Sequence, residues 1–128
     1  DITREEHVAA ALEGASYVVN LVGAFSGDLG KLMGEAPGTI ARLAAERGIR
    51  ALVHVSAIGA DAASRTAYAR GKAAGEANVA AAFPGATILR PSIVFGKDDN
   101  FINLFAGMIE LLPVLPVFGP EAKLQLVY

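Results

Sequence analysis

At 128 residues the chain has the length of a single domain. Acidic and basic residues are interspersed and leave a formal net charge of −2, so no basic patch of the kind that binds nucleic acid is present. The sequence contains no cysteine, which excludes a disulfide framework and a thiolate metal site. No apolar run reaches the roughly 18–20 residues that a membrane-spanning helix needs. This composition is compatible with a cytoplasmic protein.

The chain begins with the pattern of a short helix followed by a strand. Thr3 and Glu6 have the spacing of a capping box, which predicts a helix that runs to about Leu12. The apolar run over residues 17–22 is typical of a strand that is buried on both faces of a parallel sheet.

The middle of the chain repeats this alternation. After a loop over residues 23–30, a long helix is expected to end near Arg47. The apolar run 51–56 predicts a second buried strand, and a further helix is expected over residues 66–83, where Pro84 ends it.

The last part contains shorter apolar segments. Residues 86–89 predict a third buried strand, residues 100–112 a very apolar helix, and residues 124–128 one more strand. Strands that alternate with helices predict an α/β fold with a parallel sheet and right-handed crossovers. Ligands of such sheets bind beyond the carboxyl ends of the strands, and Gly23, Ser56 and Pro91 all follow such ends.

Three residues carry the chemical signal of the sequence: Ser56, Tyr68 and Lys72. Tyr68 and Lys72 are four residues apart, so on a helix both project from one face. Ser56 ends the strand before that helix, and a hydroxyl facing a tyrosine and a lysine predicts a proton-transfer site. An ordinary half-exposed Tyr/Lys pair and a serine that merely ends a strand are the alternatives. His54, two residues earlier, is expected to be a core histidine in preference to a catalytic one.

Two other features leave alternatives open. Gly71, Ala74, Gly75 and Asn78 form a stripe of small residues on the Tyr/Lys helix, which predicts close packing against the sheet or a second subunit. The apolar helix over residues 100–112 is expected to be core or a substrate lid. A hydrophobic partner or a membrane surface is its alternative, although it lacks a basic polar face.

The order and separation of Ser56, Tyr68 and Lys72 resemble the catalytic triad of the short-chain dehydrogenase/reductase superfamily. The segment Arg90–Gly96 looks like the one after the sixth strand in the extended and atypical branches, the NAD-dependent epimerase/dehydratase type. More narrowly, the runs 20–23, 54–56, 72–76 and 95–101 are similar to the Rossmann-type NAD(P)H-binding accessory subunit of respiratory complex I and its bacterial relatives.

The resemblance implies a partial doubly wound, Rossmann-type sheet. The superfamily begins with a strand, a glycine-rich loop and a helix that hold the pyrophosphate, and this sequence contains no such element. Asp1 and Ile2 look like the pair that follows the family's third strand. Residues 1–128 are therefore expected to be one fragment of the domain, without its first three strands and its C-terminal substrate part.

The resemblance also assigns roles to residues. Tyr68 would be the general acid/base, Lys72 would lower its pKa and hold the nicotinamide ribose, and Ser56 would hydrogen-bond the substrate carbonyl. NAD or NADP would be the cofactor. The remaining residues expected to line the dinucleotide are Asp1, Ile2, Asn20, Val22, Gly23, Pro91, Ser92 and Ile93.

Two functional hypotheses follow from the resemblance. One is an oxidoreductase or epimerase that acts on a small carbonyl or sugar substrate. The other is a non-catalytic, cofactor-binding subunit that supports assembly, with complex I subunits as partners and a peripheral place at the inner membrane. The strand over residues 17–22 would be left as an exposed sheet edge, so a homo-oligomer through this edge or through the Tyr/Lys helix is expected.

Overall fold

The computed structural model describes residues 1–99, 102–114, 121 and 123–128. It divides into two compact units, Asp1–Arg90 and Pro91–Tyr128, and each is described by itself. That the two form one domain stays a prediction.

The first unit contains a parallel sheet of three strands. Their bounds are Tyr17–Asn20 for β1, Ala51–Val55 for β2 and Thr87–Leu89 for β3, in the order β1-β2-β3. Both neighbouring pairs are parallel, with Asn20 opposite His54 and Val55 opposite Leu89. The predicted α/β fold with a partial parallel sheet is confirmed.

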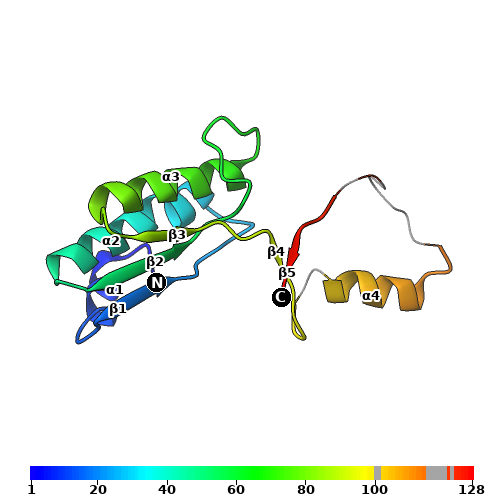
Figure 1. Ribbon diagram of the computed structural model, residues 1–128, viewed down its shortest axis with the longest axis horizontal. Helices are drawn as coiled ribbons and strands as arrows, with labels where there is room; N and C mark the ends of the chain where they lie inside the picture. The colour runs from blue at the N-terminus through cyan, green and yellow to red at the C-terminus, as the bar shows by residue number, and fades with distance from the viewer. Residues whose placement is uncertain (100–101, 115–120, 122) are drawn as a thin grey trace. The chain divides into compact units, whose positions relative to one another are not determined.

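Helices connect and cover these strands (Figure 1). Their bounds are Glu5–Ala11 for α1, Lys31–Glu35 for the π-helical turn η1, Ala36–Glu46 for α2 and Ala67–Ala82 for α3. The η1 turn leads directly into α2, so the predicted long helix is a continuous helix with a π-helical start. Thr66 caps α3, where its Oγ1 accepts a hydrogen bond from Ala69 N at 3.3 Å.

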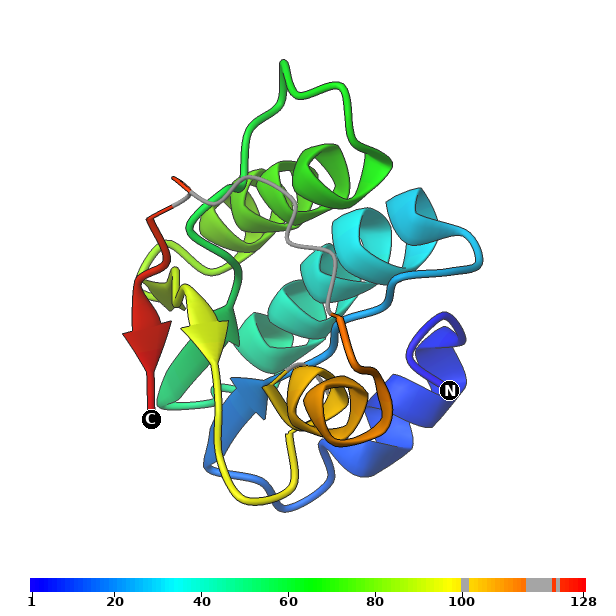
Figure 2. The same ribbon diagram turned by 90° about the vertical axis from the view of Figure 1, so that its right-hand side faces the viewer.

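The helices of this unit lie on one face of the sheet (Figure 2). The covered face packs a core of buried apolar side chains: Val8, Leu12, Ile40, Ala41, Leu43, Ala44, Ile49, Leu52 and Val79. On the other face Tyr17 and Val19 are 63% and 60% exposed. The prediction that this strand is buried on both faces is therefore wrong for the described unit. Both crossovers run the same way along the sheet, so their right-handedness places α2 and α3 on the same side.

The small-residue stripe of α3 packs inside the chain. A Cβ added to Gly75 would lie 2.1 Å from the carbonyl oxygen of Met33, and one added to Gly71 would lie 3.0 Å from that of Leu29. Asn78 Nδ2 also donates to Gly34 O at 3.0 Å. The stripe of small residues thus packs against η1 and the start of α2. The predicted contact with the sheet is present at Gly75, where an added Cβ would lie 3.5 Å from His54 Nε2 of β2, and a contact with a second subunit stays a prediction.

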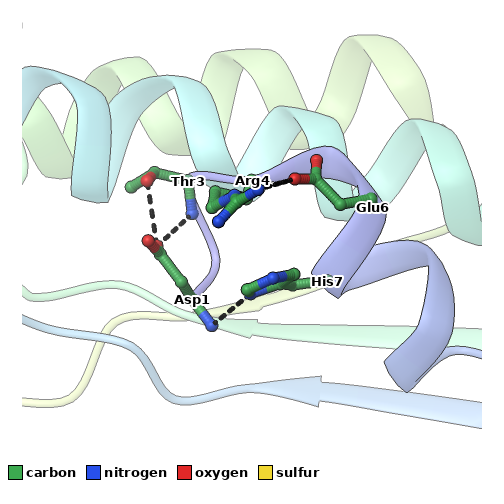
Figure 3. A network of polar contacts seen from close by, with 5 residues as sticks. All are labelled: Asp1, Thr3, Arg4, Glu6 and His7. Atoms are coloured by element: carbon green, nitrogen blue, oxygen red, sulfur yellow. Dashed lines mark hydrogen bonds and ion pairs between the residues drawn. The ribbon is translucent and has the colours of Figure 1, made fainter.

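The N-terminal turn differs from its prediction (Figure 3). The N-cap of α1 is Arg4, without a side-chain capping bond. Thr3 Oγ1 instead donates to Asp1 Oδ1 at 2.9 Å, and Glu6 accepts from Arg4 Nε at 2.7 Å. The predicted capping box is therefore wrong, because both of its side chains take nearer partners.

The second unit holds a short parallel pair, β4 Ile93–Val94 and β5 Leu126–Val127, and the helix α4 Ile102–Leu111. Phe95 and Tyr128 extend this pair with an edge-on ring contact at 5.4 Å between centroids. No residue of α4 is buried, and residues 100 and 101 of the predicted helix lie outside the described residues. Among the helices described, none has the length and apolar character to cross a membrane.

Candidate functional site

Lys72 is a buried lysine that joins the ends of two strands. It projects from α3, is 4% exposed, and its Nζ donates to Val22 O at 3.2 Å and Val55 O at 3.0 Å. These carbonyls follow β1 and end β2, so the ammonium sits at the carboxyl edge of the sheet. Burial lowers the pKa of Lys72, and the nearby Glu76 carboxylate opposes this effect. One of the three ammonium protons has no protein acceptor among the described residues.

Tyr68 lies one turn before Lys72 on α3 and is half-buried. Its ring stacks on that of Phe25, with 5.2 Å between centroids and an interplanar angle of 11°. Burial raises the pKa of Tyr68 above its ordinary value of 10.0. The expectation that Lys72 lowers this pKa is therefore wrong in this structure, because the ammonium is directed to the two strand-end carbonyls.

Ser56 follows β2 and is buried against α3, with 4% exposure. Its Oγ has no partner in ordinary hydrogen-bonding geometry among the described residues. It nevertheless lies close enough to the Glu76 carboxylate to help lower the pKa of that group. The hydroxyl is thus turned into the layer between sheet and helix, away from the surface.

Asn20 and His54 form a buried pair across β1 and β2. Asn20 Nδ2 lies 3.1 Å from His54 Nδ1, and Asn20 Oδ1 accepts from Val22 N at 3.1 Å. His54 is 1% exposed, and its pKa is lowered by burial first and by Lys72 second. The expectation of a core histidine is confirmed. Asn20 holds the turn after β1, which carries one acceptor of Lys72.

The Glu76–Arg90 ion pair was not predicted from the sequence. Glu76 is buried, and Arg90 Nε donates to its Oε1 at 2.8 Å. The second guanidinium nitrogen contacts Oε2, so the contact is bidentate. Burial acts to raise the pKa of Glu76, but the hydrogen bonds from Arg90 and the nearby Ser56 hydroxyl outweigh this effect and the pKa is lowered. No short-range spacing indicates this pair, because Arg90 follows Glu76 by 14 residues and comes after the next strand.

Four of the residues expected to line the dinucleotide border a hollow beside β1. A cavity of about 380 Å³ is bounded by Asp1, Ile2, Asn20, Val22 and side chains of α1 and α2. Figure 3 shows Asp1 beside α1. The backbone nitrogen of Asp1 lies 3.5 Å from His7 Nδ1. The structure therefore brings four of the predicted cofactor-binding residues together.

The other predicted residues divide between the two units. Gly23 stands in the first unit, where an added Cβ would meet only Lys72 Nζ, at 3.9 Å. Nothing in the described surroundings therefore demands a glycine at this position. Pro91, Ser92 and Ile93 belong to the second unit and are partly buried there, so their part in the site stays a prediction.

The residues present suit one half of a nicotinamide dinucleotide. A buried ammonium with one proton left for a hydroxyl acceptor, at the carboxyl edge of a parallel sheet, fits a ribose. A glycine-rich turn for the pyrophosphate is not contained in these 128 residues. No cluster of three or more His, Asp or Glu side chains that could hold a metal ion occurs in the described part of the chain.

Comparison with solved structures establishes the class of fold. The NAD-bound dTDP-glucose 4,6-dehydratase of Streptomyces venezuelae superposes with a TM-score of 0.76 at 20% identity, over 99% of this chain and 48% of the enzyme chain. The chain therefore has the Rossmann-type fold found in that dehydratase.

Comparison with curated sequences identifies particular relatives. The chain is 34% identical over its whole length to the mitochondrial NADH dehydrogenase [ubiquinone] 1 alpha subcomplex subunit 9 of Mus musculus. Over 69% of its length it is 36% identical to a ceramide reductase of Caulobacter vibrioides, of which it covers 29%. No protein-family model matches. The chain spans about a third of the mouse subunit, 35%. The resemblance to complex I accessory subunits is thus confirmed.

Proposed function

We propose that the protein binds NAD or NADP and that Tyr68, Lys72 and Ser56 form its site for proton and hydride transfer at a carbonyl or hydroxyl group. The observation that carries this proposal is the buried Lys72 ammonium, fixed by the ends of β1 and β2 one helical turn from Tyr68. A lysine buried without a carboxylate bonded to it is costly. Its position is therefore easier to explain by a ligand than by stability alone.

We assign Tyr68 the role of proton donor to the substrate oxygen. Because burial raises its pKa, the phenol stays protonated near neutral pH and is suited to donating a proton to a carbonyl oxygen. A bound dinucleotide supplies the hydride. Reduction of the carbonyl is accordingly the direction that the resting protonation state favours.

Lys72 and Ser56 support this step in different ways. The remaining proton of the Lys72 ammonium is available to a ribose hydroxyl, which would orient the nicotinamide. Ser56 is buried beside Glu76, so we assign its hydroxyl to supporting the Glu76 carboxylate and not to direct contact with the substrate. This role differs from the one that the family resemblance implies.

The test is Tyr68→Phe in the full-length protein, with NADH binding and turnover measured separately. Loss of a positioned general acid should reduce turnover by about 10²–10⁴-fold, while the NADH dissociation constant stays within a factor of about two, since the phenol hydroxyl alone is removed. Tyr128→Phe is the matched control, because it also removes only a phenol hydroxyl and Tyr128 is 91% exposed in the second unit. Unchanged turnover in Tyr68→Phe would contradict the assignment.

A second function is supported by the similarity to the complex I subunit along the whole chain. In this second function the protein is an assembly subunit of complex I, held peripherally at the inner membrane. The bound dinucleotide stabilises the protein and does not turn over. Lys72→Met should then weaken NADH binding and reduce the subunit's co-migration with complex I in native gels. Tyr68→Phe should change neither. Absence of the wild-type protein from complex I would eliminate this alternative.

A further inference from the structure

We infer that the substrate of this site is a ketone or aldehyde whose carbonyl carries an aromatic or aliphatic group, with Phe25 as the residue that binds that group. The inference rests on the proposed function and names its substrate class. It is drawn from the surroundings of Tyr68 within the first unit.

The ring of Phe25 is the observation that points to an apolar ligand. It is 88% exposed, although its ring stacks on that of Tyr68 with the planes nearly parallel. One face of Phe25 therefore covers the proposed proton donor, and most of the rest of the ring is open to solvent. An apolar group placed against this ring would leave water while its carbonyl lies beside the Tyr68 hydroxyl.

Two loops near Tyr68 expose apolar side chains. The loop over residues 21–29 follows β1 and the loop over 57–65 follows β2, so both leave the carboxyl end of the sheet (Figure 1). Asp61 N donates to Ala69 O at 3.2 Å, which ties the second loop to the helix turn that carries Tyr68. This loop exposes Ile58, at 59%.

The acidic side chains of these loops already accept hydrogen bonds from the backbone. Asp28 Oδ1 accepts from Lys31 N at 3.0 Å, and Asp61 Oδ1 accepts from Ala63 N at 2.9 Å. Each carboxylate thus stabilises its own turn. A polyhydroxylated sugar needs several side chains directed at its hydroxyls, whereas the large side chains that these loops expose include the apolar Phe25 and Ile58.

Reduction of such a carbonyl combines one hydride transfer with one proton transfer. A bound reduced nicotinamide dinucleotide would supply the hydride for the C–H bond at the carbonyl carbon, and the electrons of the broken C=O π bond would move to the oxygen. The Tyr68 hydroxyl gives its proton to the resulting alkoxide, and solvent returns a proton to the phenolate. The products are a secondary or primary alcohol and the oxidised dinucleotide.

The experiment measures binding of two probe ketones to the full-length protein by ligand-observed NMR, with NADH binding measured in parallel. Acetophenone should bind about tenfold more tightly than 1,3-dihydroxyacetone, because only acetophenone offers an apolar face to Phe25. Phe25→Ala should weaken acetophenone binding by about five- to tenfold and leave dihydroxyacetone unchanged. Phe25→Leu should keep part of the affinity, and Ser26→Ala, on the same loop, should keep all of it.

The outcomes distinguish a failure of the substrate class from a failure of the proposed function. Equal affinity for both ketones, or undiminished acetophenone binding to Phe25→Ala, overturns the substrate class. Normal NADH binding and a turnover that needs Tyr68 would then still support the proposed function. Failure of the protein to bind NADH or NADPH at all overturns the proposed function directly, and the substrate assignment with it.

Discussion

Gly75→Ala tests the packing that positions the candidate site. Gly75 lies in the middle of α3, where its backbone meets η1 without a side chain between them. A Cβ at this position would lie 2.1 Å from Met33 O and 3.3 Å from Met33 C. Both are backbone atoms, so no side-chain rotation can relieve the contact, and α3 must move away from η1.

Two opposing terms set the magnitude. Alanine in place of glycine in a helix interior is favourable by about 0.5–1 kcal/mol. Forcing an extra carbon into a packed contact costs about 1–3 kcal/mol, and more where the backbone itself must shift. Carbon and oxygen normally approach to about 3.3 Å, so the required movement is about 1 Å. We therefore expect a net loss of about 2 kcal/mol in the free energy of unfolding.

Chemical denaturation measures this change, and two substitutions calibrate it. Ala77→Gly, at an exposed position of α3, reports the helix propensity alone and should cost about 1 kcal/mol. Gly107→Ala, in α4 with open space around its Cβ, should be tolerated. A Gly75→Ala protein as stable as the wild type would refute the close helix contact and, with it, the reason for the position of Lys72.

Three further predictions concern local interactions and pH. Thr66→Ala should lower stability by about 1 kcal/mol through loss of the α3 cap, whereas Thr66→Ser should not, as denaturation curves will show. His54 has a lowered pKa in the folded protein, so as the pH falls the unfolded state binds a proton at this side chain before the folded state does. The free energy of unfolding should therefore fall as the pH drops below 6.5, and His54→Gln should flatten that part of the stability–pH curve. Glu76 also has a lowered pKa, so its contribution is present above pH 4.5 and is lost as the pH falls further. Glu76→Gln should remove this acid-sensitive step, and an unchanged curve would contradict the ion pair.

Features set by local chemistry were predictable from the sequence. The start of α3 follows from Thr66 and its end from Pro84, because capping and the missing amide of proline act within a few residues. Strand and helix periodicity likewise predict two features of the site. They place Ser56 at the end of β2, and Tyr68 and Lys72 on one face of a helix.

Features set by long-range packing were not predictable. The Thr3 cap was expected from spacing alone, but Asp1 lies within reach of the same hydroxyl. The pKa of Tyr68 was expected to fall, but the ammonium of Lys72 is taken by carbonyls 50 and 17 residues away in sequence. Phe25 gave no signal, because nothing in a loop sequence indicates which ring it will contact.

The open face and outer edge of β1 lead to the last prediction. Tyr17, Val19 and Leu21 are all more than half exposed, and β1 ends the sheet on its outer side in the described unit. Such an edge pairs readily with another chain, and a charge placed on it opposes that pairing. The 128-residue chain alone should therefore sediment as an oligomer or aggregate in analytical ultracentrifugation, and Val19→Lys should shift it towards the monomer. If the unsubstituted chain sediments as a single monomeric species, the exposed β1 surface is not an association site, and the predicted homo-oligomer loses its physical basis.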